Sequence, residues 1–200
     1  MNKNDIRAVS ILGLVVAVSS MIVLSGLGYW HKNLLLLIII IPILANSAVS
    51  IIFLLAKKYP PLFDIARFLA VGSSTFFVDA GIYNLLVLLT QTGQDGIWFT
   101  IFKSVSFICA ALYSFYWYKT WAFKHKENKN ISTEILQFFT VSISGLIING
   151  IASTGFVFLR EILYLNISAI IWANIGIAIG SIAAMFCNFF GYKLIVFRKK

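Results

Sequence analysis

Residues 67–89, RFLAVGSSTFFVDAGIYNLLVLL, form an apolar run that holds one acidic residue, Asp79, near its centre. A helix needs about 20 predominantly apolar residues to cross the ~30 Å hydrocarbon layer of a membrane. Five further runs of similar length occur, and the six predicted spans are 8–27, 34–56, 68–90, 97–117, 135–159 and 167–190. The runs are continuous and do not alternate with polar residues, which excludes a membrane β-barrel. The sequence therefore predicts an all-α, polytopic membrane protein.

The composition agrees with a membrane protein. Hydrophobic residues make up 60% of the chain, charged residues make up 12%, and the mean hydropathy is +0.92. Such a chain has too little polar surface to remain dissolved as a globular domain. The first run is long and no small-x-small cleavage site follows it, so we interpret it as a retained helix and not as a signal peptide.

The positive charges indicate how the helices cross the membrane. With six spans, all but three of the 16 Lys and Arg residues fall on the two tails and on the 57–67 and 119–134 loops, which share one side. Lys32 and Arg160 fall on the other side, and Lys103 lies within a span. Because Lys and Arg are enriched on cytoplasmic loops, both termini are predicted to be cytoplasmic. Topology thus accounts for the net charge of +9, and no nucleic-acid partner is expected.

A second run, QFFTVSISGLIINGIASTGFVFL at 137–159, matches the first at an offset of 70 residues. The ends of the following spans also match, because YWYKTWAFKHK at 116–126 and YKLIVFRKK at 192–200 share an aromatic–lysine–phenylalanine pattern. We predict two two-helix repeats, 64–130 and 134–200, that begin and end in the cytoplasm and so have the same orientation. Their pseudo-two-fold axis would run along the membrane normal. The repeats form a four-helix domain, 62–200, and residues 1–61 form an additional N-terminal hairpin.

One face of each of the four repeat helices carries mostly small or polar residues at helical spacing. On the first helix of the first repeat this face includes Thr75, Asp79 and Tyr83, and the second repeat has Asn149 at the position of Asp79. On the second helices the faces include Lys103 and Asn188. These faces predict a polar seam along the axis. Its members are Asp79, Lys103, Thr75, Tyr83, Asn149 and Asn188. The alternative is that such faces serve only the close packing of helices.

Asp79 and Lys103 are the two charges predicted inside the membrane. Asp79 lies 12 residues beyond Arg67, or ~18 Å into the ~30 Å core. An ionised carboxylate at that depth is costly and is by default functional. Lys103 is its natural partner, because in the second repeat both charges are replaced together, by Asn149 and Ile177. The alternative is that Lys103 extends toward the membrane surface and Asp79 is protonated.

These segments resemble the GtrA-like family of small bacterial four-helix membrane proteins. The resemblance covers residues 64–200 and does not include the N-terminal hairpin. It is carried by Phe68, Val71, Gly72, Asp79, Lys119, Trp121, Phe123, Asn188, Lys193 and Phe197. The chain departs from the family at Ser114, where Asn is common, and at positions 119 and 193, which are Lys instead of Arg.

The resemblance implies translocation of a polyprenyl-phosphate-linked monosaccharide across the bacterial cytoplasmic membrane, for cell-surface polysaccharide or teichoic acid glycosylation. It implies contact with membrane lipids, and it leaves open a membrane glycosyltransferase as partner and a homo-oligomer. With this substrate, Lys119, Lys193 and Arg67 would bind the phosphate at the cytoplasmic interface. The interfacial aromatic residues beside them are Trp117, Tyr118, Trp121 and Tyr192. Topology and an aromatic belt would explain the same residues without any ligand.

No combination of residues predicts enzymatic chemistry. The sequence has no GxxxxGK[ST] phosphate loop, no His/Cys/carboxylate set for a metal and no nucleophile–base pair. We therefore expect no catalytic residue, no metal and no cofactor. Two other functions stay open. One is a non-transporting scaffold that recruits a glycosyltransferase, and the other is a small proton-coupled exporter with Asp79 as its proton site.

Overall fold

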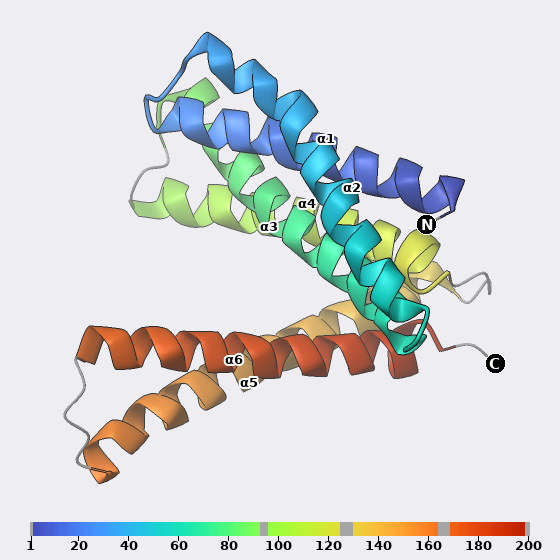
Figure 1. The fold of residues 1–200 in the computed structure, drawn as a ribbon. Helices are drawn as coiled ribbons and strands as arrows, with labels where there is room; N and C mark the ends of the chain where they lie inside the picture. The colour runs from blue at the N-terminus through green and yellow to red at the C-terminus, as the bar shows by residue number, and fades with distance from the viewer. Residues whose placement is uncertain (1, 93–95, 125–129, 164–168, 199–200) are drawn as a thin grey trace. The chain divides into compact units, whose positions relative to one another are not determined.

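The computed structural model describes residues 2–92, 96–124, 130–163 and 169–198, and six long helices account for most of them (Figure 1). The long helices are α1 (Lys3–Gly26), α2 (Leu37–Ala56), α3 (Pro61–Thr90), α4 (Gly96–Trp117), α5 (Ile131–Ile162) and α6 (Ala169–Gly191). The short helices are the 3₁₀ helix η1 (Lys32–Leu36) and the π-helices η2 (Tyr118–Ala122) and η3 (Tyr192–Val196). The four described ranges contain no strand.

Among the described residues, six helices are long and apolar enough to cross a membrane, which confirms the predicted all-α, six-span fold class. Three of them, α1, α3 and α5, begin at least four residues earlier than the predicted spans. α3 begins at Pro61, because a proline fits the first helical position, where its missing N–H needs no partner. α5 begins at Ile131, where the side chain of Asn130 accepts a 3.1 Å hydrogen bond from the Ser132 N–H. The cytoplasmic position of the termini and the orientation of the repeats stay predictions.

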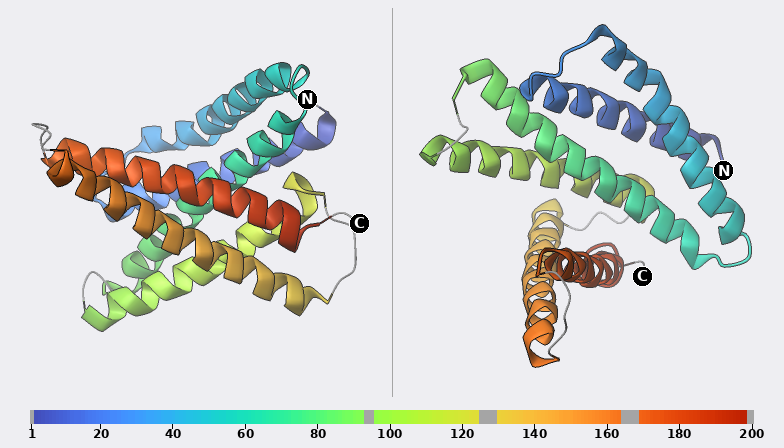
Figure 2. Two further views of the ribbon diagram at one scale, coloured as in Figure 1. Left: turned by 90° about the horizontal axis from the view of Figure 1, so that it is seen from below. Right: turned by 60° about the vertical axis from the view of Figure 1, so that its left-hand side comes forward.

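The chain divides into two compact units, residues 1–124 and 125–200. In the first unit, α1 packs against α2 and α3, α2 also packs against α3, and α3 packs against α4 (Figure 2). The predicted boundary near residue 61 falls inside this unit. The N-terminal hairpin and the first predicted repeat therefore share one core.

The glycines at which α1 lies close to α2 and α3 include Gly13 and Gly81. A Cβ added to Gly13 on α1 would lie 2.7 Å from the Cα of Pro42 on α2, and one added to Gly81 on α3 would lie 2.9 Å from the side chain of Ser19 on α1. Beside the first contact, the Asn46 amide donates to the Pro42 carbonyl at 2.8 Å, one turn back along α2. Side chains larger than hydrogen are excluded at both glycines, as is usual where membrane helices pack closely.

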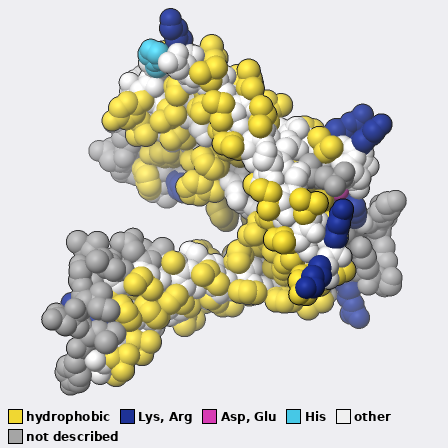
Figure 3. All heavy atoms as spheres, viewed as in Figure 1, with side chains coloured by type: hydrophobic (Ala, Val, Ile, Leu, Met, Phe, Trp, Pro, Cys, Tyr) yellow, Lys and Arg dark blue, Asp and Glu magenta, His cyan; other side chains and the backbone are white. Residues whose placement is uncertain are grey.

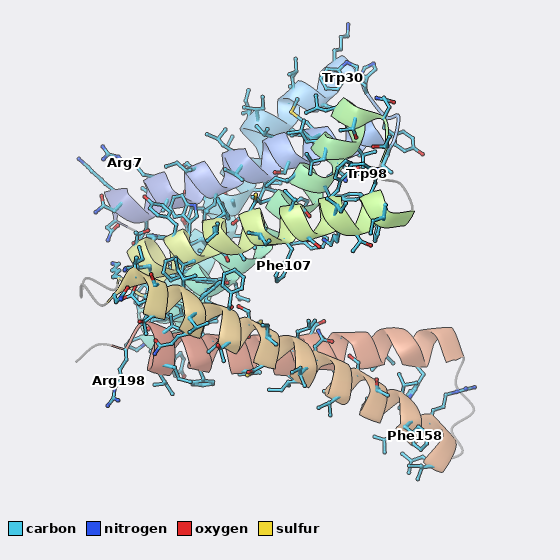
Figure 4. All side chains as sticks on the ribbon, turned by 180° about the vertical axis from the view of Figure 1, so that it is seen from behind. Arg7, Trp30, Trp98, Phe107, Phe158 and Arg198 are labelled. Carbon is cyan, nitrogen blue, oxygen red and sulfur yellow. The ribbon has the colours of Figure 1, made fainter. Side chains whose placement is uncertain are left out.

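The two ends of the first unit differ in chemistry. Trp30 and Trp98 lie at one end and Arg7 lies at the other (Figure 4). We call the second end the Arg67 end, because α1 and α3 begin there, α2 and α4 end there, and Arg67 lies near the start of α3. On the face shown in Figure 3, hydrophobic side chains cover much of the helices, and most of the visible Lys and Arg side chains lie toward the helix ends. This distribution is typical of helices that span a membrane.

The second unit is a pair of helices, α5 and α6, packed through small residues. A Cβ added to Gly180 on α6 would lie 2.6 Å from the Asn149 carbonyl oxygen of α5. A Cβ added to Gly191 would lie 2.5 Å from a methyl of Val141. At the other end of the pair, the indole of Trp172 stacks on Phe156 with ring centroids 4.5 Å apart. The small-residue faces of α5 and α6 therefore contribute to close helix packing.

Replacing Gly180 by leucine should destabilise the α5–α6 pair by about 1–3 kcal/mol, because the backbone of α5 leaves no room for the side chain. The matched control is Gly150→Leu on α5, since nothing lies within 4 Å of a Cβ added there. Thermal unfolding of the full chain in detergent measures the difference. Equal melting temperatures for the two variants would contradict the close approach at Gly180.

Candidate functional site

Asp79 on α3 and Lys103 on α4 form an ion pair between Asp79 Oδ2 and Lys103 Nζ. The hydroxyl of Ser106, one turn along α4 from Lys103, donates a 2.6 Å hydrogen bond to Asp79 Oδ1. Both oxygens of the carboxylate therefore have a partner on α4. The structure thus brings together the two charges that the sequence places inside the membrane. We call Asp79, Lys103 and Ser106 the Asp79 site.

The Asp79 site is buried on one side and open on the other. Ser106 is fully buried and the Asp79 side chain is 21% exposed, whereas the Lys103 side chain is 47% exposed. A lone charge at the centre of a bilayer costs about 2.5–3.5 kcal/mol on insertion scales, so each of these charges needs the other. Lys103 keeps its counter-ion and still presents N–H donors outward.

The other predicted seam residues of the first unit, Thr75 and Tyr83, lie on the same helix as Asp79. The Thr75 hydroxyl donates to the Val71 carbonyl of its own helix at 2.8 Å. The ring of Tyr83 packs edge-on against Phe99 of α4, with centroids 5.6 Å apart. The Tyr83 contact therefore fixes α3 against α4 one turn beyond Asp79, where the ion pair also joins them.

Asn149 and Asn188, the predicted seam residues of the second unit, lie in the α5–α6 contact. The Ser153 hydroxyl donates to the Asn149 side-chain oxygen at 3.1 Å. Asn188 packs over Gly145, and a Cβ added to that glycine would lie 2.8 Å from the Asn188 amide nitrogen. The Asn188 side-chain oxygen is buried and has no hydrogen-bond partner within the described ranges. The second unit therefore has a neutral amide, Asn149, at the position that matches Asp79 in the repeat. It does not repeat the charges of the Asp79 site there.

Lys119 and Lys193 occupy matching places in the two π-helices. In each unit the chain leaves its last helix through η2 or η3, and the N–H of Phe123 or Phe197 donates to the carbonyl five residues back. The Lys119 ammonium lies 6.0 Å from the centroid of Phe115, and the Lys193 ammonium lies 5.5 Å from that of Phe189. The repeated sequence pattern thus corresponds to a repeated local structure, a π-turn with a lysine over a phenylalanine ring.

The tyrosines of the two π-helices are structural. Tyr118 stacks on Phe68, with centroids 5.2 Å apart, and Tyr192 stacks on Phe138 at 4.6 Å. The Tyr192 and Ser142 hydroxyls form a 2.7 Å hydrogen bond.

Three of the four aromatic residues predicted for the interface are buried, at 5–6% exposure. They are Tyr118, Trp121 and Tyr192. Trp117 is half-buried and packs edge-on against Trp121. These side chains therefore hold helix ends together, and this packing explains the pattern in addition to any contact with the membrane surface.

Arg67 is bound by a residue that the sequence analysis missed. Asp5, in the first turns of α1, accepts hydrogen bonds from the Arg67 Nε at 3.2 Å and from the Trp121 indole N–H at 3.0 Å. Asp5 is 2% exposed and Arg67 is 9% exposed. The guanidinium also lies 5.4 Å from the ring centroid of Phe53. One carboxylate thus joins α1, α3 and η2, and it offsets the charge of Arg67.

The sequence holds a weak signal for Asp5. It is an isolated acid at the start of the first span, on the side of the membrane where Arg67 is predicted, but nothing in its spacing identifies a partner. Glu134 is a second acid of this kind, fully buried in the first turn of α5. It follows Asp64 by the repeat offset of 70 residues, so the repeat could have identified it.

Comparison with known proteins identifies one family. The family model described as GtrA/DPMS, transmembrane domain, matches residues 67–197. A search of curated proteins and a search of solved structures gave no match. The match begins at Arg67 and ends at Phe197, so it includes the Asp79 site and both π-helices and leaves out α1 and α2. The chain belongs to the GtrA-like family of membrane proteins, as the resemblance of residues 64–200 indicated.

Proposed function

We propose that this chain translocates a polyprenyl-phosphate-linked monosaccharide across the bacterial cytoplasmic membrane and is not an enzyme. Membership of the GtrA-like family supports a part in the handling of such lipids. The observation that carries the proposal is the Asp79 site, an ion pair between two spanning helices with a half-exposed Lys103. An ion pair that only held α3 against α4 would not need an exposed Lys103. A polar path for a headgroup needs an accessible ammonium.

The chemistry of the Asp79 site suits a sugar. A monosaccharide presents hydroxyl groups, which both donate and accept hydrogen bonds. The Lys103 ammonium can donate to a hydroxyl oxygen, and the carboxylate of Asp79 can accept from a second hydroxyl. Because the two charges neutralise each other, the site can bind the neutral sugar without holding an excess charge in the membrane.

The membrane potential favours outward movement of this substrate. A phosphodiester carries one negative charge, and an inside-negative potential contributes about 2.3 kcal/mol per 100 mV to its exit. The polyprenyl tail can stay in the lipid while the headgroup crosses. Translocation toward the outer leaflet therefore needs no nucleotide.

Lys119 and Lys193 are proposed to collect the phosphate before the headgroup enters the membrane. An ammonium on a flexible stem binds an anion as a point charge and releases it again. Both lysines lie where a spanning helix ends, beside buried aromatic rings that fix the backbone. Arg67 takes a smaller part in this proposal, because Asp5 already offsets its charge.

Replacing Lys119 or Lys193 by alanine should raise the substrate concentration for half-maximal transport about tenfold with little loss of stability. Hydrogen bonds to charged groups contribute about 1.5–3 kcal/mol, and 1.4 kcal/mol corresponds to a factor of ten. Lys124→Ala is the control, since Lys124 is an exposed lysine that follows η2. An equal effect of all three substitutions would mean that the lysines act only through net charge.

The proposal is tested with the purified chain in lipid vesicles that contain undecaprenyl-phosphate-glucose in both leaflets. An enzyme added outside releases accessible glucose, and the slow phase reports lipid that crosses the membrane. Faster crossing than in protein-free vesicles supports translocation. Equal rates would reject it in favour of the scaffold, and proton flux that depends on a solute other than this lipid would favour the exporter.

A further inference from the structure

The N-terminal hairpin is joined by a hydrogen bond to η2, the π-turn that carries Lys119. The indole N–H of Trp121, two residues beyond Lys119, donates to Asp5 Oδ1 of α1 at 3.0 Å. Both side chains are buried, and the Trp121 ring also packs edge-on against Trp117, with centroids 6.3 Å apart. A residue of α1 therefore holds a turn that lies 116 residues further along the chain.

Asp5 is a well-fixed acceptor for this bond. Its backbone N–H donates to the side chain of Asn2, the N-cap of α1, at 2.8 Å. Its carboxylate also accepts from the Arg67 Nε of α3 at 3.2 Å. A hydrogen bond to an ionised carboxylate is about twice as strong as one between neutral groups. Because Asp5 is fixed on α1 and on α3, its bond to Trp121 fixes η2 against both helices.

The second π-turn, η3, cannot make the same bond. An offset of 74 residues aligns the two turns and places Ile195 at the position of Trp121. The Ile195 side chain has no N–H to donate, and this residue is 53% exposed. The tyrosine stack and the phenylalanine N–H bond, in contrast, occur in both turns. The contact with α1 therefore distinguishes η2 from η3.

A fixed turn matters for Lys119 because its side chain projects from η2. The Lys119 ammonium lies 6.0 Å from the ring centroid of Phe115, which is buried one turn earlier on α4. The last carbonyls of a helix have no partner further along it, so a single π-turn at a helix end depends on contacts with its surroundings. A cation on a backbone that is fixed in advance binds an anion with a smaller loss of conformational freedom. The Trp121 bond should therefore raise the affinity of Lys119 for an anion.

We propose that the N-terminal hairpin positions Lys119 for the phosphate of the lipid, through the hydrogen bond between Asp5 and Trp121. This inference rests on the proposed function, in which Lys119 and Lys193 collect the phosphate. It gives a role to α1, which the family match does not cover. It also makes the two lysines unequal, because Lys119 projects from a turn that α1 holds and Lys193 does not. Asp5 and Trp121 are positioning residues.

The test is a double-mutant cycle on transport of undecaprenyl-phosphate-glucose by the full chain in vesicles. Trp121→Phe keeps an aromatic ring, removes the N–H donor and leaves the pair of Asp5 and Arg67 in place. It should raise the half-saturating substrate concentration about threefold to tenfold, the range that one net hydrogen bond supplies, with little change in maximal rate. The same increase should appear in the Lys193→Ala background and should be absent in the Lys119→Ala background.

Ile195→Phe is the matched control, because it places the same ring at the matching, exposed position of η3. It should leave the half-saturating concentration unchanged. A general loss of stability cannot imitate the expected result, since it would affect the Lys119→Ala and Lys193→Ala backgrounds alike. Equal effects of Trp121→Phe in the two backgrounds would therefore overturn the positioning role.

Hydrogen exchange of the unchanged chain tests the hold on η2 without any variant. Backbone amides of residues 118–123 should exchange more slowly than those of residues 192–197, because only the first turn is bound to α1 through a tryptophan. Equal exchange in the two turns, or faster exchange in the first, would overturn the proposal.

The same cycle on binding of undecaprenyl phosphate to the full chain in detergent requires no transport. An effect of Trp121→Phe on binding that depends on Lys119, without translocation in vesicles, would retain the positioning role and reject only the proposed function. Translocation with equal effects in the two backgrounds would reject only the positioning role. No binding of undecaprenyl phosphate by the unchanged chain would also overturn the positioning role, because Lys119 would then have no phosphate to bind.

Discussion

The double variant Asp79→Asn with Lys103→Ile should fold as well as the unchanged chain and translocate the lipid-linked sugar at least about tenfold more slowly. It reproduces the pair Asn149 and Ile177 that the second repeat carries at the matching positions. Removing both charges leaves no unpaired charge in the membrane, so the contact between α3 and α4 should keep its stability. The route, however, loses both its ammonium donor and its carboxylate acceptor.

The single variant Asp79→Asn separates the two roles of the pair. It leaves Lys103 without a counter-ion, which should lower both stability and transport. Initial transport rates and thermal unfolding of the unchanged chain, the single variant and the double variant give the comparison. If the pair only holds α3 against α4, the double variant will recover stability and transport together. Full transport by the double variant would therefore remove the Asp79 site from the mechanism.

Replacing Asp5 by asparagine should destabilise the chain by up to about 3–5 kcal/mol, the usual cost of breaking a buried ion pair, because Arg67 then has to rely on the more exposed Asp64, whose Oδ1 lies 4.0 Å from its Nη1. The variant keeps the size of the side chain and can still accept from Trp121, so the loss reports the charge opposite Arg67. The free energy of unfolding of the full chain, measured in detergent, is the readout. Arg7→Gln is the control, because Arg7 lies on the same helix and is exposed (Figure 4).

A second substitution shows whether the effect of Asp5 belongs to the pair. Arg67→Met in the Asp5→Asn background removes the charge that has lost its buried partner and should restore much of the lost stability, because the effects of substitutions at residues in contact are not additive. No recovery in the double variant would mean that Asp5 acts through its other contacts at the start of α1. An effect no larger than that of Arg7→Gln would contradict the buried network itself.

The fold class follows from the sequence because backbone N–H and C=O groups inside a membrane need partners within the protein. Continuous apolar runs of this length meet that need as helices. The pair of Asp79 and Lys103 could also be predicted, since two lone opposite charges inside spans have only each other as partners. Asp5 could not be predicted from its spacing. Its partners, Arg67 and Trp121, lie 62 and 116 residues away, and only the packing of α1 on α3 brings them together.

The aromatic–lysine–phenylalanine pattern does not show by its composition whether its tyrosines lie at the membrane surface or are buried. Aromatic residues beside lysines at the end of a span usually indicate the membrane surface. Here Tyr118 and Tyr192 are buried and stack on phenylalanines near the starts of α3 and α5. The sequence repeat was visible, but its cause, a π-turn that turns the tyrosine inward, depends on backbone geometry that the pattern does not encode.

The central claim is that the sugar passes the Asp79 site, and site-directed photocrosslinking tests it most directly. Phe107 is exposed on α4 (Figure 4), and helical spacing places it one turn from Lys103 on the same face. Val105 is also exposed, and the same spacing places it on the opposite face at nearly the same depth. A photoreactive benzoylphenylalanine at position 107 should capture the radiolabelled sugar of undecaprenyl-phosphate-glucose, and the same residue at position 105 should not. Equal capture at the two positions, or none at 107 while transport proceeds, would contradict the account.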